Sequence, residues 1–303
     1  TGYGEASVRL FKPLIAAVGV RATHARLGGQ GEDVPLALAL AGSSITAERT
    51  ETAILPSASL LAQISPDARI YARYQEGFRP GGLAVADDFV RQFRSDHVRT
   101  VELGAGVGEP GRGRYDLSAN IAHSNWRDIQ ADFIDGTGLP STANVGNGTI
   151  WTISFSGSAE LAAGLRIDLG GSYNDSKVDE PVLFAFDRLT QVPNVAQFSG
   201  RAGLDWNHEL ASGLTLDGRG WVSYIGKSRL GIGPELGELQ GDYLDSGLLL
   251  RLGRERAGLT IAVTNIADVQ GNRFAFGTPF SLGREQITPL QPRTIRVGMD
   301  ARF

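Results

Sequence analysis

The sequence predicts an all-β fold, a transmembrane antiparallel up-and-down β-barrel. Apolar and polar residues alternate along about 13 segments, and short and long connections between these segments alternate along the chain. The composition is that of a turn-rich β protein, with 40 glycines, one methionine and no cysteine in 303 residues. The longest apolar run, 34–42, is too short for a membrane helix. Any membrane crossing must therefore be made by strands.

The clearest strands have one apolar and one polar face. In 151–161, the residues Trp151, Ile153 and Phe155 share a face, and the polar residues between them share the other. The same period of two marks 70–78, 114–125, 165–173, 194–209 and 294–303. Aromatic residues near strand ends suit the interfacial girdles of a membrane barrel; they are Trp151, Tyr173, Trp206, Trp221, Tyr224 and Phe303.

The connections fall into two classes. Short turns are expected near 12–13, 65–67, 108–113, 162–164, 211–213 and 256–258. Long polar connections are expected at 25–48, 78–96, 131–147, 178–193, 227–241 and 268–290. Outer-membrane barrels have short periplasmic turns and long extracellular loops. The alternation therefore predicts that all long connections lie at the extracellular end.

The segment Arg79-Pro80-Gly81-Gly82 ends the strand that begins near Ile70. Proline removes a backbone donor, and the two glycines permit backbone angles that a pleated strand does not use. We expect strand pairing to stop near Phe78, where a long connection begins.

Several classes of function are not favoured by the sequence. The formal net charge is −4 and the cations are scattered, which argues against a nucleic-acid partner. The glycine-rich segment 104–113 is followed by a strand rather than a helix, so we expect a turn and not a phosphate-binding loop. The four histidines, at 24, 97, 123 and 208, fall on separate elements. The sequence thus predicts no metal site, no cofactor and no enzymatic activity.

Five ordered segments resemble the C-terminal barrel portion of TonB-dependent outer-membrane receptors. They are YARYQEGFRPGG at 71–82, TVELG at 100–104, 126–146, TNIAD at 264–268 and PRTIRVGMDARF at 292–303. The resemblance implies a Gram-negative outer-membrane receptor that takes up a scarce ligand, such as a ferric siderophore-type chelate, by TonB-dependent active import. The implied partners are TonB, a small-molecule ligand, and the lipid and lipopolysaccharide of the outer membrane.

The resemblance also implies a longer polypeptide. Receptors of this family have a plug domain and about 22 strands, so 1–303 is expected to be the C-terminal part, without the plug and about nine first strands. Two alternatives stay open. One is a passive porin-like channel formed by a smaller closed barrel, and the other is a soluble β-rich binding or adhesion module.

Polar residues beside the expected extracellular rim are candidate ligand-binding residues. One group lies in the connection 78–96, and the other begins the next connection; together they comprise Arg79, Asp87, Asp88, Arg91, Arg94, Trp126, Arg127 and Asp128, with Gln130 and Asp132 nearby. Arginine and aromatic side chains can hold an anionic, ring-bearing ligand by paired hydrogen bonds and stacking. The alternative is a solvated loop, or packing between loops and lipopolysaccharide.

Overall fold

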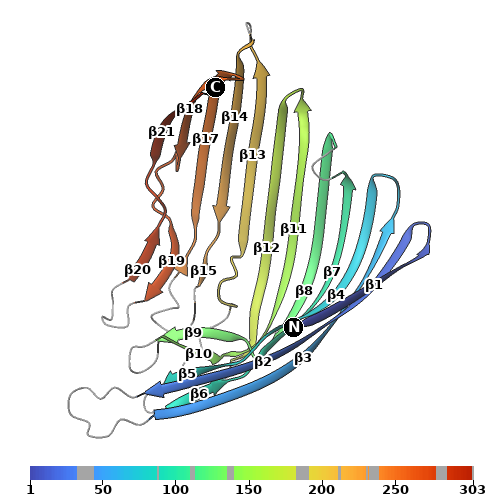
Figure 1. Cartoon of the computed structure of the whole chain (residues 1–303), viewed down its shortest axis with the longest axis vertical. Coiled ribbons are helices and arrows are strands. Elements are labelled where there is room, and N and C mark those ends of the chain that lie inside the picture. Colours follow the sequence, from blue (N-terminus) through green and yellow to red (C-terminus); the bar gives the residue numbers. More distant parts are fainter. Residues whose placement is uncertain are drawn as a thin grey trace.

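The computed structural model describes residues 1–32, 44–86, 89–109, 113–134, 140–181, 191–210, 213–229, 231, 239–277 and 285–301 (Figure 1). Within these ranges, no helix is long and apolar enough to cross a membrane.

One antiparallel sheet of 13 strands dominates the fold, and its strands follow one another in chain order from β1 at one edge to β21 at the other. This confirms the predicted fold class and number of strands. The strands are β1 (Gly2–Phe11), β2 (Leu14–Glu32), β3 (Ser44–Gln63), β4 (Ala68–Arg79), β7 (Asp96–Gly108), β8 (Tyr115–Arg127), β11 (Gly146–Ala162), β12 (Leu165–Pro181), β13 (Phe198–Glu209), β14 (Thr215–Ile225), β17 (Tyr243–Arg254), β18 (Ala257–Thr264) and β21 (Thr294–Ala301).

The short turns lie at one end of this curved sheet and the long connections at the other, as predicted (Figure 1). The short turns join β1 to β2, β3 to β4, β7 to β8, β11 to β12, β13 to β14 and β17 to β18. Each long connection follows the second strand of such a pair. We refer to the end with the long connections as the extracellular end.

The long connections contain structure that the sequence analysis did not predict. Four small hairpins lie in them: β5 (Gly82–Ala86) with β6 (Phe89–Phe93), β9 (Gln130–Ile134) with β10 (Pro140–Asn144), β15 (Ser228–Arg229) with β16 (Leu239–Gln240), and β19 (Asn272–Gly277) with β20 (Glu285–Pro289). Pairing of β2 with β3 also continues as far as Glu32 opposite Ser44, inside the expected loop 25–48. Hairpins and extended strands satisfy backbone hydrogen bonds that a structureless loop would leave to water.

The two faces of the sheet differ in chemistry, as the alternation predicts. On the outer face, large apolar side chains are exposed; examples are Ile153 at 52%, Val297 at 68% and Met299 at 87%. A water-soluble sheet would bury such a band, whereas a membrane barrel turns it toward lipid.

On the inner face, polar side chains pair across neighbouring strands. Hydroxyl groups lie 2.8 Å apart in the pairs Thr100–Ser124, Ser118–Ser156 and Ser172–Ser199. The Tyr71 hydroxyl donates to Glu102 at 2.5 Å. The sheet therefore has a hydrogen-bonded polar wall on the side that faces the barrel interior.

One of the aromatic residues predicted for the girdles, Trp221, is on the inner face of the sheet. Trp221 lies opposite Gly203 and Gly247, two positions along β14 from Arg219, so it shares the inner face with that arginine. Its ring covers Gly247, where a side chain would have no room. Trp221 thus packs on the polar wall instead of at the lipid boundary. Phe303 lies outside the described residues.

Candidate functional site

The predicted site residues that the structure describes lie at the extracellular end of the sheet. Arg79 is the last residue of β4, Arg94 lies between β6 and β7, and Trp126 and Arg127 end β8, directly before Asp128. For Arg91 only the backbone, in β6, is described. Asp87 and Asp88 lie outside the described residues.

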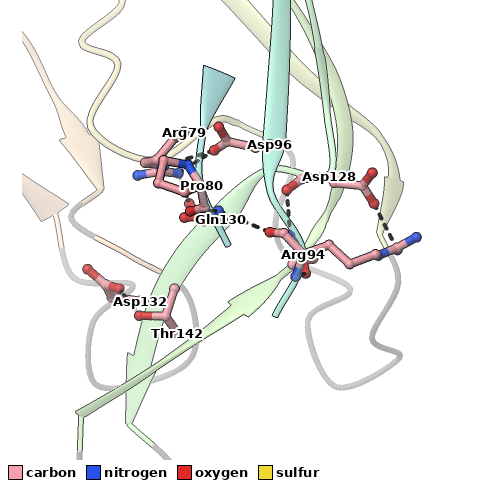
Figure 2. Close-up of polar contacts among 9 residues, drawn as sticks. Arg79, Pro80, Arg94, Asp96, Asp128, Gln130, Asp132 and Thr142 are labelled. Atoms are coloured by element: carbon pink, nitrogen blue, oxygen red, sulfur yellow. Dashed lines mark hydrogen bonds and ion pairs between the residues drawn. The ribbon is translucent and has the colours of Figure 1, made fainter. Parts of the chain in front are cut away.

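Arg79 is held by a buried carboxylate. Its Nε and Nη2 atoms donate to Oδ2 of Asp96 at 3.0 and 2.5 Å, and Nη2 also donates to the Gln130 carbonyl at 2.9 Å (Figure 2). The Asp96 side chain is only 5% exposed, whereas that of Arg79 is 51% exposed. The two side chains meet because Arg79 and Asp96 are opposite one another at the ends of the paired strands β4 and β7. Half of the guanidinium side chain thus remains accessible beside its anchor.

Two side-chain amides tie the connection β4–β7 to the connection β8–β11. Gln130 Nε2 donates to the carbonyls of Pro80 and Arg94, at 3.0 Å each. Asn144 Nδ2 donates to the carbonyls of Arg94 and Asp128 at 2.9 and 2.7 Å, and its Oδ1 accepts from the Arg94 N–H at 2.6 Å. An ion pair of 2.8 Å between Arg94 and Asp128 spans the same junction (Figure 2).

A small apolar core supports this polar junction. Its buried members are Ile129, Ala131, Val145, Val178 and Val192, and Trp126, Phe133, Ile150 and Val195 pack against them. Ile129 and Val145 are each 1% exposed within this cluster, and Ile129 also exchanges backbone hydrogen bonds with the strand entry at Val145 and Gly146. The β9–β10 hairpin is thereby fixed over the end of the sheet by both apolar and polar contacts.

Trp126 presents its ring to Arg79. The guanidinium carbon of Arg79 lies 6.0 Å from the centroid of the Trp126 ring, at the outer limit of a cation–π contact. Trp126 is opposite Val98 and Gly148, so its side chain is on the inner face. A half-exposed guanidinium and an indole ring therefore lie together at the extracellular end of the barrel interior.

Arg127 is not brought to this group. It lies opposite His97 and follows Trp126 directly in β8, so its side chain is on the outer face. Among the predicted residues whose side chains are described, four lie together: Arg79, Arg94, Trp126 and Asp128. The Arg127 side chain is on the opposite face of the sheet. Asp132 accepts a hydrogen bond of 2.7 Å from Thr142 within the β9–β10 hairpin.

A second anchor holds the start of the β4–β7 connection. Glu51 Oε2 accepts from the Gly81 N–H at 2.8 Å, and Oε1 accepts from Arg49. Burial raises the pKa of the Glu51 carboxyl, but the hydrogen bonds from Gly81 and Arg49 outweigh it, so the pKa lies below its ordinary value of 4.5. Glu51 lies beyond the outer apolar band of β3, whose extracellular limit is Ile54, and is therefore outside the membrane-spanning part.

The sequence analysis missed three residues of this region: Glu51, Asp96 and Asn144. Their partners are 30, 17 and 50 residues away. An Asp at the last position of the expected connection 78–96 was a usable signal for Asp96. No local pattern distinguished Asn144 from the other polar residues of its loop. Within the described ranges, no three His, Asp or Glu side chains are grouped as metal ligands would be.

Comparison with known proteins gives one family and several similar structures. A family model described as "TonB dependent receptor-like, beta-barrel" matches residues 1–266. The sequence matches no curated protein directly.

The solved structures are similar in fold at low sequence identity. The ferric yersiniabactin uptake receptor FyuA from Yersinia pestis has a TM-score of 0.83 at 17% identity, over 99% of this chain and 45% of its own. The ferric-catecholate import receptor Fiu from K12 E. coli has a TM-score of 0.73 at 14% identity, over 99% and 44%. The copper transporter OprC has a TM-score of 0.71 at 13% identity, over 99% and 48%. The chain spans less than half the length of these proteins.

Proposed function

The chain belongs to the family of TonB-dependent receptor-like β-barrels, and we propose that it is the C-terminal barrel portion of an active importer. It lies, as a member of this family, in the outer membrane of a Gram-negative bacterium. Importers of this kind carry their ligand through a barrel that a plug domain closes, and TonB supplies the coupling to the inner membrane. The chain is a transport receptor and not an enzyme in this proposal.

The two unpaired edges of the sheet support the proposal of a longer barrel. β1 and β21 stand at its two edges, and an unpaired strand edge in lipid leaves backbone groups without hydrogen bonds. Because this chain covers 45% of the similar receptor FyuA, we propose that residues 1–303 complete a barrel of about 22 strands together with a preceding plug and first strands. A porin-like channel made by these 13 strands alone would first have to close these edges.

The observation that carries the ligand proposal is the group formed by Arg79, Arg94, Trp126 and Asp128 at the extracellular end. We propose that it makes the first contact with an anionic, ring-bearing ligand such as a ferric siderophore-type chelate. Arg79 keeps half of its side chain exposed although Asp96 fixes its position, so little conformational entropy is lost when it binds. Trp126 supplies a stacking surface beside it. Asp87, Asp88 and Arg91, from the same connection, remain candidates for the same contact.

Uptake in whole cells tests the import proposal. Cells that carry the intact receptor as their iron importer would be given radioactive iron as catecholate, phenolate or hydroxamate chelates. We expect saturable uptake of at least one anionic chelate, and its loss in otherwise identical cells that lack TonB. Equal uptake with and without TonB would overturn active import and favour the porin-like channel.

Binding to the purified receptor tests the site. Arg79→Gln removes the exposed charge, and we expect chelate affinity, measured by quenching of tryptophan fluorescence, to fall about tenfold or more. The matched control is Arg26→Gln, an exposed arginine paired with Glu48 at 3.1 Å on the outer face of β2. Equal affinity of the Arg79→Gln variant and the unmodified receptor would remove Arg79 from the site.

A further inference from the structure

Aromatic side chains form a row on the outer face at the extracellular limit of the apolar band. The row comprises Tyr74, His123, Trp151, Tyr173, Phe198 and Tyr224. His123 lies opposite Trp151 and stacks on it at 4.4 Å, and Tyr173 lies opposite Phe198. Aromatic rows of this kind mark the boundary between hydrocarbon and lipid headgroups. Outward-facing residues just beyond the row therefore lie at headgroup level.

Two arginines face outward directly beyond this row. Arg99 on β7 is two residues past Val101, which pairs with Tyr74 and His123; Arg127 on β8 is four residues past His123. Arg99 is opposite Asn125, so Arg127 is its diagonal neighbour on the same face. Diagonal side chains in a sheet start about 7–8 Å apart, a separation that two guanidinium groups can close around one phosphate.

The environment fixes one arginine and leaves the other accessible. Arg99 Nε lies 3.3 Å from Oε1 of Glu76, whose side chain is 15% exposed and also accepts a hydrogen bond from the Tyr74 hydroxyl. Arg99 itself remains 52% exposed. Arg127 is exposed, and among the described residues its side chain has no ion pair or hydrogen bond. Two guanidinium groups and one carboxylate leave a net positive charge on this part of the outer face.

We propose that Arg99 and Arg127 bind a phosphate group of lipopolysaccharide, the phosphorylated glycolipid of the outer leaflet. The guanidinium fork matches the oxygen geometry of phosphate, and Glu76 holds the Arg99 fork toward the lipid side. Position favours a lipid source over free phosphate, because both arginines project from the lipid-facing surface at headgroup level. The site depends on the outer-membrane location and not on the identity of the imported ligand.

Native mass spectrometry of the intact receptor with defined lipids tests this site. The probes are lipid A with both phosphates, the same lipid A after removal of its phosphates, and inorganic phosphate. For the double variant Arg99→Gln and Arg127→Gln, we expect affinity for the bisphosphorylated lipid to fall about 30-fold, from the usual contribution of two cations at an anionic membrane surface. Affinity for the dephosphorylated lipid should be the same in both proteins.

Two further variants separate phosphate recognition from general effects. Lys177→Gln removes another outward cation, which is 73% exposed and paired with Asp179 at 3.2 Å; we expect less than about a threefold change. Replacement of both arginines by lysine keeps the charge and should restore part of the affinity. Heat-dependent electrophoretic mobility would report whether each barrel is folded.

Three outcomes would overturn the proposal. One is equal binding of the bisphosphorylated lipid by the unmodified receptor and the folded double variant. Another is an equal loss in the folded Lys177→Gln variant. The third is competition by inorganic phosphate at concentrations similar to those of the lipid, which would indicate a site for free anions.

Discussion

Gly81 shows why glycine is needed at the start of the β4–β7 connection. A Cβ atom there would lie 2.9 Å from Arg49 Nε and from the Ser95 N–H, and closer still to the Phe93 carbonyl. Because two of these neighbours, Phe93 and Ser95, make the contact with backbone atoms, they have little freedom to move. The glycine pair thus ends the strand, as predicted, and also permits close packing that the sequence did not indicate.

We expect Gly81→Ala to loosen this connection by about 1–3 kcal/mol through overpacking. Hydrogen exchange of the backbone amides of residues 82–93 in the intact receptor would measure the change. Gly28→Ala is the control, since a Cβ at Gly28 would meet nothing within 4 Å. Similar exchange in both variants would contradict the packing argument.

Glu51 makes the same connection sensitive to acid. Its pKa is lowered in the folded protein, so the ionised carboxylate stabilises the fold at pH values above its ordinary 4.5. That contribution disappears as the pH falls below 4.5 and through the lowered pKa, because protonation weakens the bonds from Gly81 and Arg49. We expect exchange near Gly81 to increase over this acid range in the native receptor. In Glu51→Gln this pH dependence should be absent; if it persists, another group is responsible.

Among the elements, the β9–β10 hairpin joins the candidate site to the end of the sheet. It rests on the apolar core around Ile129 and Val145, and its polar side chains bond the neighbouring connection. Two long connections therefore form one folded unit. Arg79, the residue proposed to contact the ligand, is itself bonded to this hairpin through the Gln130 carbonyl.

Asn144→Ala removes three hydrogen bonds, two that cross this junction to Arg94 and one to the Asp128 carbonyl of the same connection. Each neutral bond contributes about 0.5–1.5 kcal/mol, so we expect exchange in residues 130–144 to increase at least tenfold. Thr142→Ala is the matched control, because its bond to Asp132 stays within the hairpin. If both substitutions have the same effect, the hairpin is held by its apolar core alone.

The strand period of two decides on which face of the sheet each side chain of β8 lies. Trp126 and Arg127 are adjacent in sequence, yet one side chain enters the barrel interior and the other faces outward. Grouping them as one candidate site followed from their chemistry and not from their place in a strand. Because β8 extends to Arg127, both residues belong to the strand and their side chains lie on opposite faces.

At the scale of the whole molecule, the central question is how the sheet closes. We expect the polypeptide extracted from native outer membranes to have a mass well above the 32.3 kDa of this chain, because the open edges of the sheet require further strands. Mass spectrometry under denaturing conditions measures this directly. A mass near 32.3 kDa would mean that the chain closes by itself or with a partner.

A barrel closed by a plug is expected to be impermeable to small sugars. Liposomes that contain the intact receptor should remain closed to small sugars, since the plug fills an interior that would otherwise be a wide pore. Swelling in isotonic sugar measures the leak, and a general porin is the positive control. Free passage of sugars through the intact receptor would support the porin-like alternative.

Structures of similar fold serve different ligands. Two are receptors for ferric chelates and one is a copper transporter, although all three have comparable folds. Chains of this fold thus serve different ligands, so ligand choice depends on site residues and not on the barrel fold.

The sequence by itself determined the fold class, the alternation of two faces along the strands and the order in which short and long connections follow one another. These are local properties: side chains alternate with a period of two, and a cluster of proline and glycine, such as Pro80-Gly81-Gly82, favours the end of a strand. Only the tertiary structure decided which residues meet at the extracellular end. Asp96 reaches Arg79, and Asn144 reaches Arg94, because strand register and hairpin packing bring together residues 17 and 50 positions apart. A periodic pattern along the chain indicates only local structure, so it cannot predict contacts between residues so far apart in sequence.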